Sequence, residues 1–173
     1  LDFMTKFILI DGNSLMNRAF YALPPLTNQS GFQTNGIFGF LNMLNRVMKE
    51  EKPEYLVVAF DAGKKVFRHE IYENYKGSRK ETPEALKLQF PVLKEVLAAM
   101  GIPQLEIKGY EADDLIGTLA RQGSEAGFEV LIITGDRDSF QLIGPHTTVL
   151  YTKRGITEIE RVDEAYLFEK YGI

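Results

Sequence analysis

Acidic residues follow three short apolar runs of the sequence, where they could bind a metal ion together. The runs are residues 7–10, 55–60 and 128–134, and the acids that follow them are Asp11, Asp61 and Asp136, with Asp138 two residues further on. If the runs are neighbouring parallel strands, their carboxyl ends face one crevice, which is where ligands bind in open α/β sheets. We therefore expect these carboxylates to converge.

A second group of acids stands where a helix is expected to begin. Glu111, Asp113 and Asp114 fall within four consecutive positions. A single acid in a first turn is explained by its interaction with the helix macrodipole, which stabilises the helix by about 0.3 to 1 kcal/mol. Three acids this close repel one another, so stability alone does not favour the arrangement.

Divalent cations would neutralise the two groups of acids. Oxygen ligands without Cys or His favour Mg²⁺ or Mn²⁺ over zinc. Seven carboxylates exceed the shell of one Mg²⁺ ion, which usually keeps several waters. We therefore predict two ions, which at roughly 3.5 to 4 Å apart can clamp the attacking and leaving oxygens of a phosphodiester. Phosphodiester hydrolysis is the leading hypothesis.

A basic and aromatic stretch begins soon after Asp61. Its bases are Lys64, Lys65, Arg68, Lys76, Arg79 and Lys80, and they are interleaved with Phe67, Tyr72 and Tyr75. Basic side chains neutralise phosphates, and aromatic rings stack on unpaired bases. The stretch therefore predicts binding of single-stranded nucleic acid, although each residue taken alone fits a solvated charged loop equally well.

The elements that must position these residues alternate between apolar runs and helical patterns. The expected helices are residues 36–51, 83–100, about 111–126 and from 163 onward, and further strands are expected at 104–107 and 147–151. Pro91 should kink or divide the second helix. The alternation predicts an α/β domain whose mostly parallel sheet has helices on both faces. Residues 24–35 and 62–82 fit no element and are expected to be functional loops.

Composition bounds the chain to one soluble globular domain, or to a domain with a small appendage. It has 173 residues, of which 45% are hydrophobic and 25% charged, with a net charge of −4, and this balance excludes a disordered chain. The lack of Cys excludes disulfides and thiolate chemistry and fits a reducing, cytoplasmic setting. No apolar run approaches the roughly 20 residues of a membrane span. No Gly-x-Gly-x-x-Gly follows the first run, which disfavours a dinucleotide site.

Other polar residues carry weaker signals. We expect Asn13 and Ser14 to cap the helix that follows them rather than to act in catalysis. Arg18, one turn further, either faces the crevice or forms a surface salt bridge. His69 and His146 lack a partner at metal-ligand spacing, so surface or packing roles are expected for both.

Six segments together carry a family resemblance. They are residues 7–14 (FILIDGNS), 58–63 (VAFDAG), 67–70 (FRHE), 75–79 (YKGSR), 110–114 (YEADD) and 134–138 (TGDRD). In this order, over nearly the whole chain, they resemble the 5′-nuclease domain family of bacterial DNA polymerase I, in the flap-endonuclease branch of the PIN-like nucleases. The resemblance implies a PIN-like (resolvase-like) fold over residues 1–173. It also implies hydrolysis at 5′ flaps and 5′ ends of DNA and at RNA–DNA junctions, as in primer removal and repair.

The resemblance also implies roles for individual residues. The implied ligands of the first metal are Asp61, Glu111, Asp113 and Asp114, with Asp11 bonding through water, and those of the second are Asp136 and Asp138. Lys76 and Arg79 match bases that approach the scissile phosphate, and Tyr75 matches a position where an unpaired base stacks. Residues 62–82 would form the arch through which a single strand passes.

The family continues after a segment like residues 168–173 into a helical module that grips duplex DNA. We expect that module to be absent from this chain, and a polymerase domain to lie in the same full-length protein. Two alternatives to the nuclease therefore stay open. One is a fragment that binds metal and single strands without appreciable turnover. The other is a PIN-type ribonuclease, which shares the acids but does not need residues 75–79.

We predict that Lys76→Ala and Arg79→Ala weaken binding of single-stranded DNA. Each phosphate contact releases condensed counterions. Removing one contact should therefore reduce the slope of log K against log salt concentration by about 0.7 in magnitude. If the two side chains also stabilise charge on the scissile phosphate, kcat should fall as well. In a chain that lacks the helical module we expect the binding effect with little or no cleavage. Salt titrations of binding check this, and salt-independent binding unchanged by either substitution would contradict it.

Overall fold

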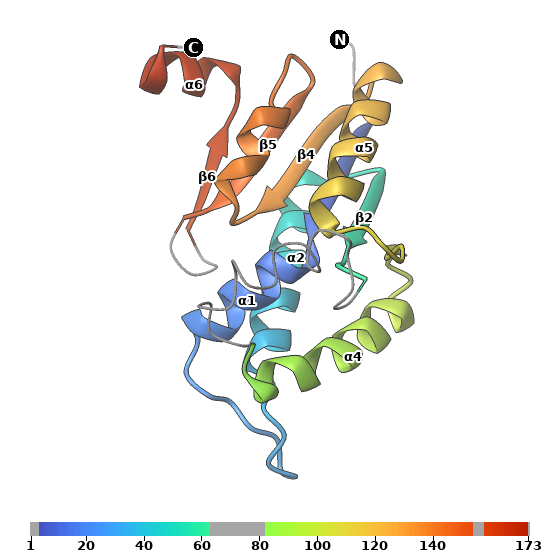
Figure 1. Ribbon diagram of the computed structural model, residues 1–173, viewed down its shortest axis with the longest axis vertical. Helices are drawn as coiled ribbons and strands as arrows, with labels where there is room; N and C mark the ends of the chain where they lie inside the picture. The colour runs from blue at the N-terminus through green and yellow to red at the C-terminus, as the bar shows by residue number, and fades with distance from the viewer. Residues whose placement is uncertain (1–3, 63–81, 154–157, 173) are drawn as a thin grey trace.

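A six-stranded sheet forms the centre of the molecule (Figure 1). The computed structural model describes residues 4–62, 82–153 and 158–172. The strands are β1 (Lys6–Asp11), β2 (Tyr55–Ala59), β3 (Gln104–Leu105), β4 (Glu129–Thr134), β5 (Thr147–Thr152) and β6 (Ile159–Val162), in the spatial order β3-β2-β1-β4-β5-β6. The first five are parallel, and β6 is antiparallel to β5. The predicted mostly parallel sheet is confirmed.

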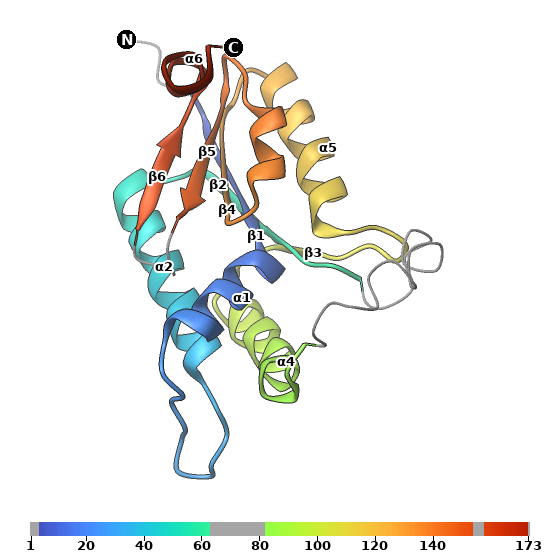
Figure 2. The ribbon, with the colours of Figure 1, turned by 60° about the vertical axis from the view of Figure 1, so that its left-hand side comes forward.

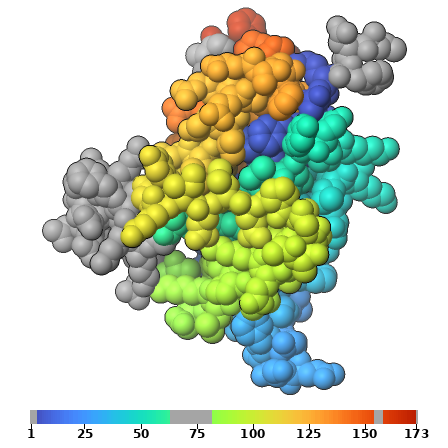
Figure 3. All heavy atoms as spheres, turned by 90° about the vertical axis from the view of Figure 1, so that its right-hand side faces the viewer, coloured from blue at the N-terminus to red at the C-terminus, as the bar shows by residue number. Residues whose placement is uncertain are grey.

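Helices cover both faces of the sheet, as predicted (Figure 2). One face carries α1 (Gly12–Ala22), α2 (Asn35–Glu51) and α4 (Glu84–Ala99), and the other carries α5 (Ala112–Glu125), the 3₁₀-helix η1 (Arg137–Leu142) and α6 (Glu164–Tyr171). Successive residues of a strand point to opposite faces. Ile8 and Ile10 of β1 therefore pack under α1 and α2, while Phe7 and Leu9 pack under α5. Figure 3 shows the side of the molecule where α4 and α5 both reach the surface.

Three local features can be compared with the sequence-based expectations. Pro91 lies inside α4, which continues through it, so of the two predicted effects, a kink or a division, the division does not occur. Pro91 is exposed, and water can therefore bond the carbonyl that its missing N–H leaves unpaired. The edge strand β6 was not predicted, because its sequence, Ile-Glu-Arg-Val, does not form an apolar run. Residues 24–34 form a narrow projecting loop, as predicted, closed by a bridge between Thr27 and Gln33, while Asn35 already belongs to α2.

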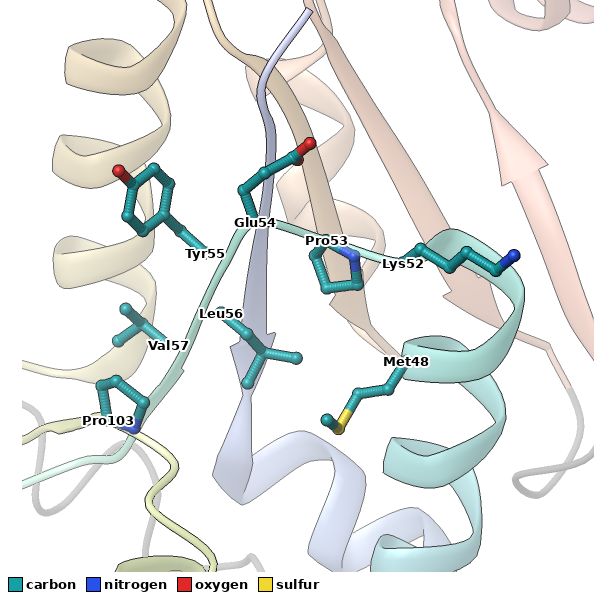
Figure 4. A pocket seen from close by; sticks show the side chains of 8 residues that line it. All are labelled: Met48, Lys52, Pro53, Glu54, Tyr55, Leu56, Val57 and Pro103. Carbon is teal, nitrogen blue, oxygen red and sulfur yellow. The ribbon is translucent and has the colours of Figure 1, made fainter.

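The edge of the sheet beside β2 is only partly covered. The short strand β3 pairs with Val58 and Ala59, at the carboxyl end of β2. Next to the first half of β2 lies an open pocket of about 530 Å³, lined by Met48, Lys52, Pro53, Glu54, Tyr55, Leu56, Val57 and Pro103 (Figure 4). The pocket therefore lies at the amino end of β2, away from the acids that follow the strands.

A buried polar bridge joins α2 to α4. The Gln89 side chain is fully buried, and its Nε2 donates to Asn35 Oδ1 at 3.0 Å. Its Oε1 accepts from the backbone N–H of Ile37 at 3.1 Å, in the first turn of α2. Asn35 Nδ2 in turn donates to the Phe20 carbonyl of α1 at 2.9 Å. The bridge therefore fixes three helices relative to one another on the same face of the sheet.

Among the described residues, no helix combines the length and the apolar character that crossing a lipid bilayer requires. The sequence-based expectation about membrane spans therefore meets no contrary finding in that part of the chain.

We predict that Gln89→Leu lowers the free energy of unfolding by about 2 kcal/mol or more. The substitution leaves the Ile37 N–H and Asn35 Oδ1 without their partner inside the core, at a cost of roughly 1 to 3 kcal/mol for each buried group. Urea denaturation measures the loss. Gln122→Leu, the same change at an exposed position of α5, is the control and should stay within about 0.5 kcal/mol of the parent. Equal effects of the two substitutions would contradict the bridge.

Candidate metal centre

The carboxyl ends of β1, β2 and β4 bring acids to one edge of the sheet, as the sequence predicted. Asp11 is the last residue of β1, and Asp61 and Asp136 each follow two residues after β2 and β4. β1 lies between β2 and β4 in the sheet. The chain leaves β1 toward β2 on one side, and β4 pairs with β1 on the other, so these acids flank the point where the strand order reverses.

A direct hydrogen bond joins the start of α5 to the end of β2. Asp61 Oδ1 accepts from the backbone N–H of Ala112 at 2.6 Å. The preceding residue, Glu111, is the N-cap of α5 and forms a reciprocal capping box with Asp114, whose Oδ2 accepts from the Glu111 N–H at 3.1 Å. Helix capping therefore explains part of the acidic cluster structurally, as the alternative reading of the sequence allowed.

Asp11 is the most buried of the candidate ligands. Its side chain is 4% exposed and caps α1, with Oδ1 accepting from the Ser14 N–H at 3.1 Å and Oδ2 accepting from the Thr134 hydroxyl at 2.9 Å. Burial raises the pKa of Asp11 to about 7, and the charges of Asp113 and Asp61 add to the rise, while the two hydrogen bonds oppose it. Near neutral pH this carboxyl is partly protonated in the absence of a cation.

Asp113 lies near four other acids. Desolvation raises its pKa to about 6, and Asp136, Asp61, Glu111 and Asp114 add to the rise, in that order. Glu111 and the other three acids therefore lie close enough to Asp113 to repel it. The structure thus brings Asp11, Asp61, Glu111, Asp113, Asp114 and Asp136 into one electrostatic neighbourhood.

The loop after β4 holds the remaining candidate ligands. Asp136 is the N-cap of η1, and its Oδ1 accepts from the Asp138 N–H at 2.9 Å. The Asp136 N–H donates to Thr134 Oγ1 at 3.1 Å. Asp138 is exposed in the first turn of η1. Its backbone, rather than its carboxylate, is therefore what joins it to the other acids.

The donor set fits Mg²⁺ or Mn²⁺, because every candidate ligand is a carboxylate. Within residues 4–62, 82–153 and 158–172, however, no three acidic or histidine side chains are arranged to hold one ion between them. Binding would therefore require side-chain rotation. A carboxylate that accepts one hydrogen bond still has lone pairs for a cation.

The predicted arch lies outside the described residues. Lys64, Lys65, Arg68, Tyr72, Tyr75, Lys76, Arg79 and Lys80 all belong to residues 63–81, so their roles stay predictions. His69 lies there too, whereas His146 is exposed, as expected. Next to the acids, an open groove of about 590 Å³ extends from Asp113 and Asp114 along α5 to Arg121 and past η1.

Two polar residues after Asp11 do not cap α1, so that expectation was wrong. Asp11 itself is the cap, because it is the residue with extended backbone at the end of β1. Asn13 and Ser14 instead accept hydrogen bonds from the loops after β2 and β4. Arg18 faces the loop after β4, where its Nη2 donates to the Gly135 carbonyl at 3.1 Å. Thr134 was missed as a site residue, although a hydroxyl at the end of a buried apolar run is a usable signal.

Comparison with known proteins places the chain in a family. The model of the 5′-3′ exonuclease N-terminal, resolvase-like domain matches residues 6–172. The chain belongs to this family. It is 53% identical to DNA polymerase I of Bacillus caldotenax and 47% identical to that of Bacillus subtilis (strain 168), each over 168 residues. These matches cover 97% of this chain and 19% of each polymerase, so the exonuclease domain spans about a fifth of its curated relatives.

Solved structures show the same fold at low sequence identity. T5 5′-exonuclease with divalent zinc ions bound matches with a TM-score of 0.69 at 20% identity, covering 97% of this chain and 61% of that one. The bacteriophage T5 flap endonuclease in a pseudo-enzyme–product complex with DNA and metal ions matches with a TM-score of 0.67 at 19% identity, covering 97% and 61%. The likeness confirms the resolvase-like architecture of this 5′-3′ exonuclease domain.

We predict that the metal-free chain loses stability as pH rises from about 4 toward 7. Asp11 and Asp113 have folded pKa values of about 7 and about 6, above the ordinary 3.8, so the folded state binds more protons in this window. Their contribution is complete below pH 3.8 and is lost as pH rises through the folded values. Urea denaturation in EDTA across this range checks the slope.

In the same assay, Asp113→Asn or Asp61→Asn should raise metal-free stability at pH 7 while weakening metal binding. Asp113→Asn should raise the free energy of unfolding by about 1 kcal/mol. This is less than the pKa shift alone implies, because the exposed side chain is screened by solvent. Asn at position 61 keeps an oxygen for the Ala112 N–H. Glu95→Gln on the exposed side of α4 is the control. If both Asn variants melt well below the parent without metal, these acids are structural caps.

Proposed function

We propose that this chain is a divalent-metal-dependent 5′-nuclease core, which hydrolyses phosphodiesters at 5′ flaps and 5′ ends of DNA. The observation that supports it is the set of six acids, from β1, β2, α5 and the loop after β4, that lie in one another's field at the reversal of strand order. A fold stabilised only by packing would not gather mutually repelling carboxylates at a ligand-binding edge. Membership of the exonuclease family supports the same activity.

Two Mg²⁺ or Mn²⁺ ions are proposed as cofactors. Asp61, Glu111, Asp113 and Asp114 would hold the first ion, with Asp11 bonding through water, and Asp136 and Asp138 would hold the second. When bound, such ions supply Lewis acidity and orient the attacking and leaving oxygens of the phosphodiester. Binding of the metal ions would neutralise the repulsion among the carboxylates. The negative charge that destabilises the metal-free chain would therefore provide the affinity for the ions.

The chain's own residues would bind and orient the substrate strand. Residues 62–82 are proposed as an arch for the single strand, with Lys76 and Arg79 against the scissile phosphate and Tyr75 stacked on an unpaired base. Cationic side chains there would stabilise the negative charge that develops as the phosphodiester is cleaved. The groove along α5, which starts at Asp113 and Asp114, offers space for a strand beside the acids.

The proposed substrates are DNA with a 5′ flap or 5′ end and RNA–DNA junctions. A polymerase domain in the same full-length protein is the proposed covalent partner, since the curated relatives are DNA polymerase I proteins of which this chain spans about 19%. Such an arrangement would place removal of a 5′ strand and synthesis of its replacement in one polypeptide.

We predict that any cleavage of a 5′-flap oligonucleotide requires Mg²⁺ or Mn²⁺ and is lost in Asp113→Asn. Each metal should also raise the melting temperature of the chelator-treated chain, because ligand at one hundred times Kd stabilises the native state by about 2.7 kcal/mol. Labelled flap DNA measured with and without EDTA, beside a melting scan, gives both readouts. Glu95→Gln serves as the matched control.

The remaining outcomes separate the alternatives. Metal and strand binding without cleavage favours the silent fragment, and preferential cleavage of single-stranded RNA favours a PIN-type ribonuclease. Cleavage that persists in EDTA, or a melting temperature that neither metal moves, contradicts the proposed metal-dependent nuclease.

A further inference from the structure

The first turn of α1 contacts both strand-end loops that carry candidate ligands. Asn13 Oδ1 accepts from the Asp61 backbone N–H at 2.9 Å, in the loop after β2. Ser14 Oγ accepts from the Gly135 backbone N–H at 2.8 Å, in the loop after β4. These loops lie on opposite sides of β1. Two consecutive side chains therefore hold the two loops on either side of β1.

Neither side chain is needed to cap its own helix. The Asp11 carboxylate already accepts the Ser14 N–H, which leaves the oxygens of Asn13 and Ser14 for the neighbouring loops. The backbone N–H groups of Asp61 and Gly135 lie past the ends of β2 and β4, where the ladder offers no further partner from β1. A fixed acceptor at each N–H therefore sets where the adjoining carboxylates, those of Asp61 and Asp136, stand.

Glycine at two positions allows this close approach. A Cβ at Gly12 would lie 2.5 Å from a ring carbon of Phe60 and 2.9 Å from the Ala59 carbonyl oxygen. A Cβ at Gly135 would lie 2.6 Å from Arg18 Nε and 3.1 Å from Ser14 Oγ. A side chain at position 12 would collide with the Ala59 backbone and the buried Phe60 ring, so α1 can approach the end of β2 this closely only because residue 12 is glycine. At position 135 a Cβ would displace the Arg18 side chain and tighten the contact with Ser14.

Thr134 completes the connection on the β4 side. Its buried hydroxyl donates to Asp11 Oδ2 at 2.9 Å and accepts from the Asp136 N–H at 3.1 Å. The central acid Asp11 is thereby tied to the same loop that Ser14 holds. The loop after β4 is therefore bonded by Ser14 and Arg18 of α1 and by Thr134, whereas the loop after β2 is bonded from α1 by Asn13.

We propose that Asn13 and Ser14 are positioning residues that set the separation between the β2-side and β4-side acids and thereby the affinity for divalent cations. The assignment rests on the proposed metal-dependent function. Side chains that orient metal ligands through hydrogen bonds typically contribute roughly 10- to 100-fold to metal affinity. Asn13 acts on the side of Asp61, and Ser14 acts on the side of Asp136.

The test measures Mn²⁺ binding by calorimetry on Asn13→Ala and Ser14→Ala, beside amide hydrogen exchange. Each variant should bind Mn²⁺ at least about 10-fold more weakly than the parent chain. Exchange should quicken at the Asp61 amide in the first variant and at the Gly135 amide in the second. Ser14→Thr, which keeps the acceptor oxygen, should restore much of the affinity lost in Ser14→Ala.

Asn17→Ala is the matched control. It removes the same amide group from the same helix, and among the described residues that side chain bonds only the Asn13 carbonyl, inside α1. It should leave the Mn²⁺ affinity within about twofold of the parent. Unchanged Mn²⁺ affinity in Asn13→Ala and Ser14→Ala, with faster amide exchange, would overturn the assignment and leave both residues purely structural. A parent chain that binds no Mn²⁺ would instead overturn the proposed function and the assignment with it.

Discussion

Repulsion among carboxylates at the carboxyl ends of β1, β2 and β4 is the constraint that the surrounding structure accommodates. A parallel sheet delivers these strand ends to one edge whatever their charge, so acids placed there must be held together against their own field. The core beneath supplies the rigidity, because the alternating residues of β1 and β4 are fully buried against helices on both faces. The acids at the strand ends are therefore attached to a closely packed and rigid sheet.

Hydrogen bonds from backbone N–H groups hold the carboxylates at this edge in place despite their repulsion. Asp11, Asp61, Asp114 and Asp136 each accept a backbone N–H, and three of these bonds also define how a helix begins. The same hydrogen bond therefore caps the helix and fixes the position of a candidate metal ligand. A substitution that removes a carboxylate oxygen would disturb the helix start as well as the charge, which is why isosteric amides are the informative replacements.

The sequence predicted the acids better than their supports. Asp11, Asp61 and Asp136 follow short continuous apolar runs, and such a run is enough to predict a buried parallel strand and therefore where its carboxyl end lies. The partners of Asn13 and Ser14 could not be predicted, because a polar side chain in a first turn bonds its own helix or a neighbouring loop depending on which strand lies beside it. Glu111 and Asp114 form a capping box, as the sequence allowed, and they also lie near Asp113, while their role as metal ligands stays a prediction.

The short strand β3 has a consequence for how the domain behaves among its neighbours. It covers β2 only at Val58 and Ala59, which leaves the first half of β2 without a strand on that side in the described part of the chain. An open strand edge is a template on which other chains can assemble. Here the edge is flanked by Pro53 and Pro103, which have no N–H to offer, and by the charged pair Lys52 and Glu54. Residues of these kinds disfavour intermolecular sheet extension, here at the end of the sheet away from the candidate metal centre.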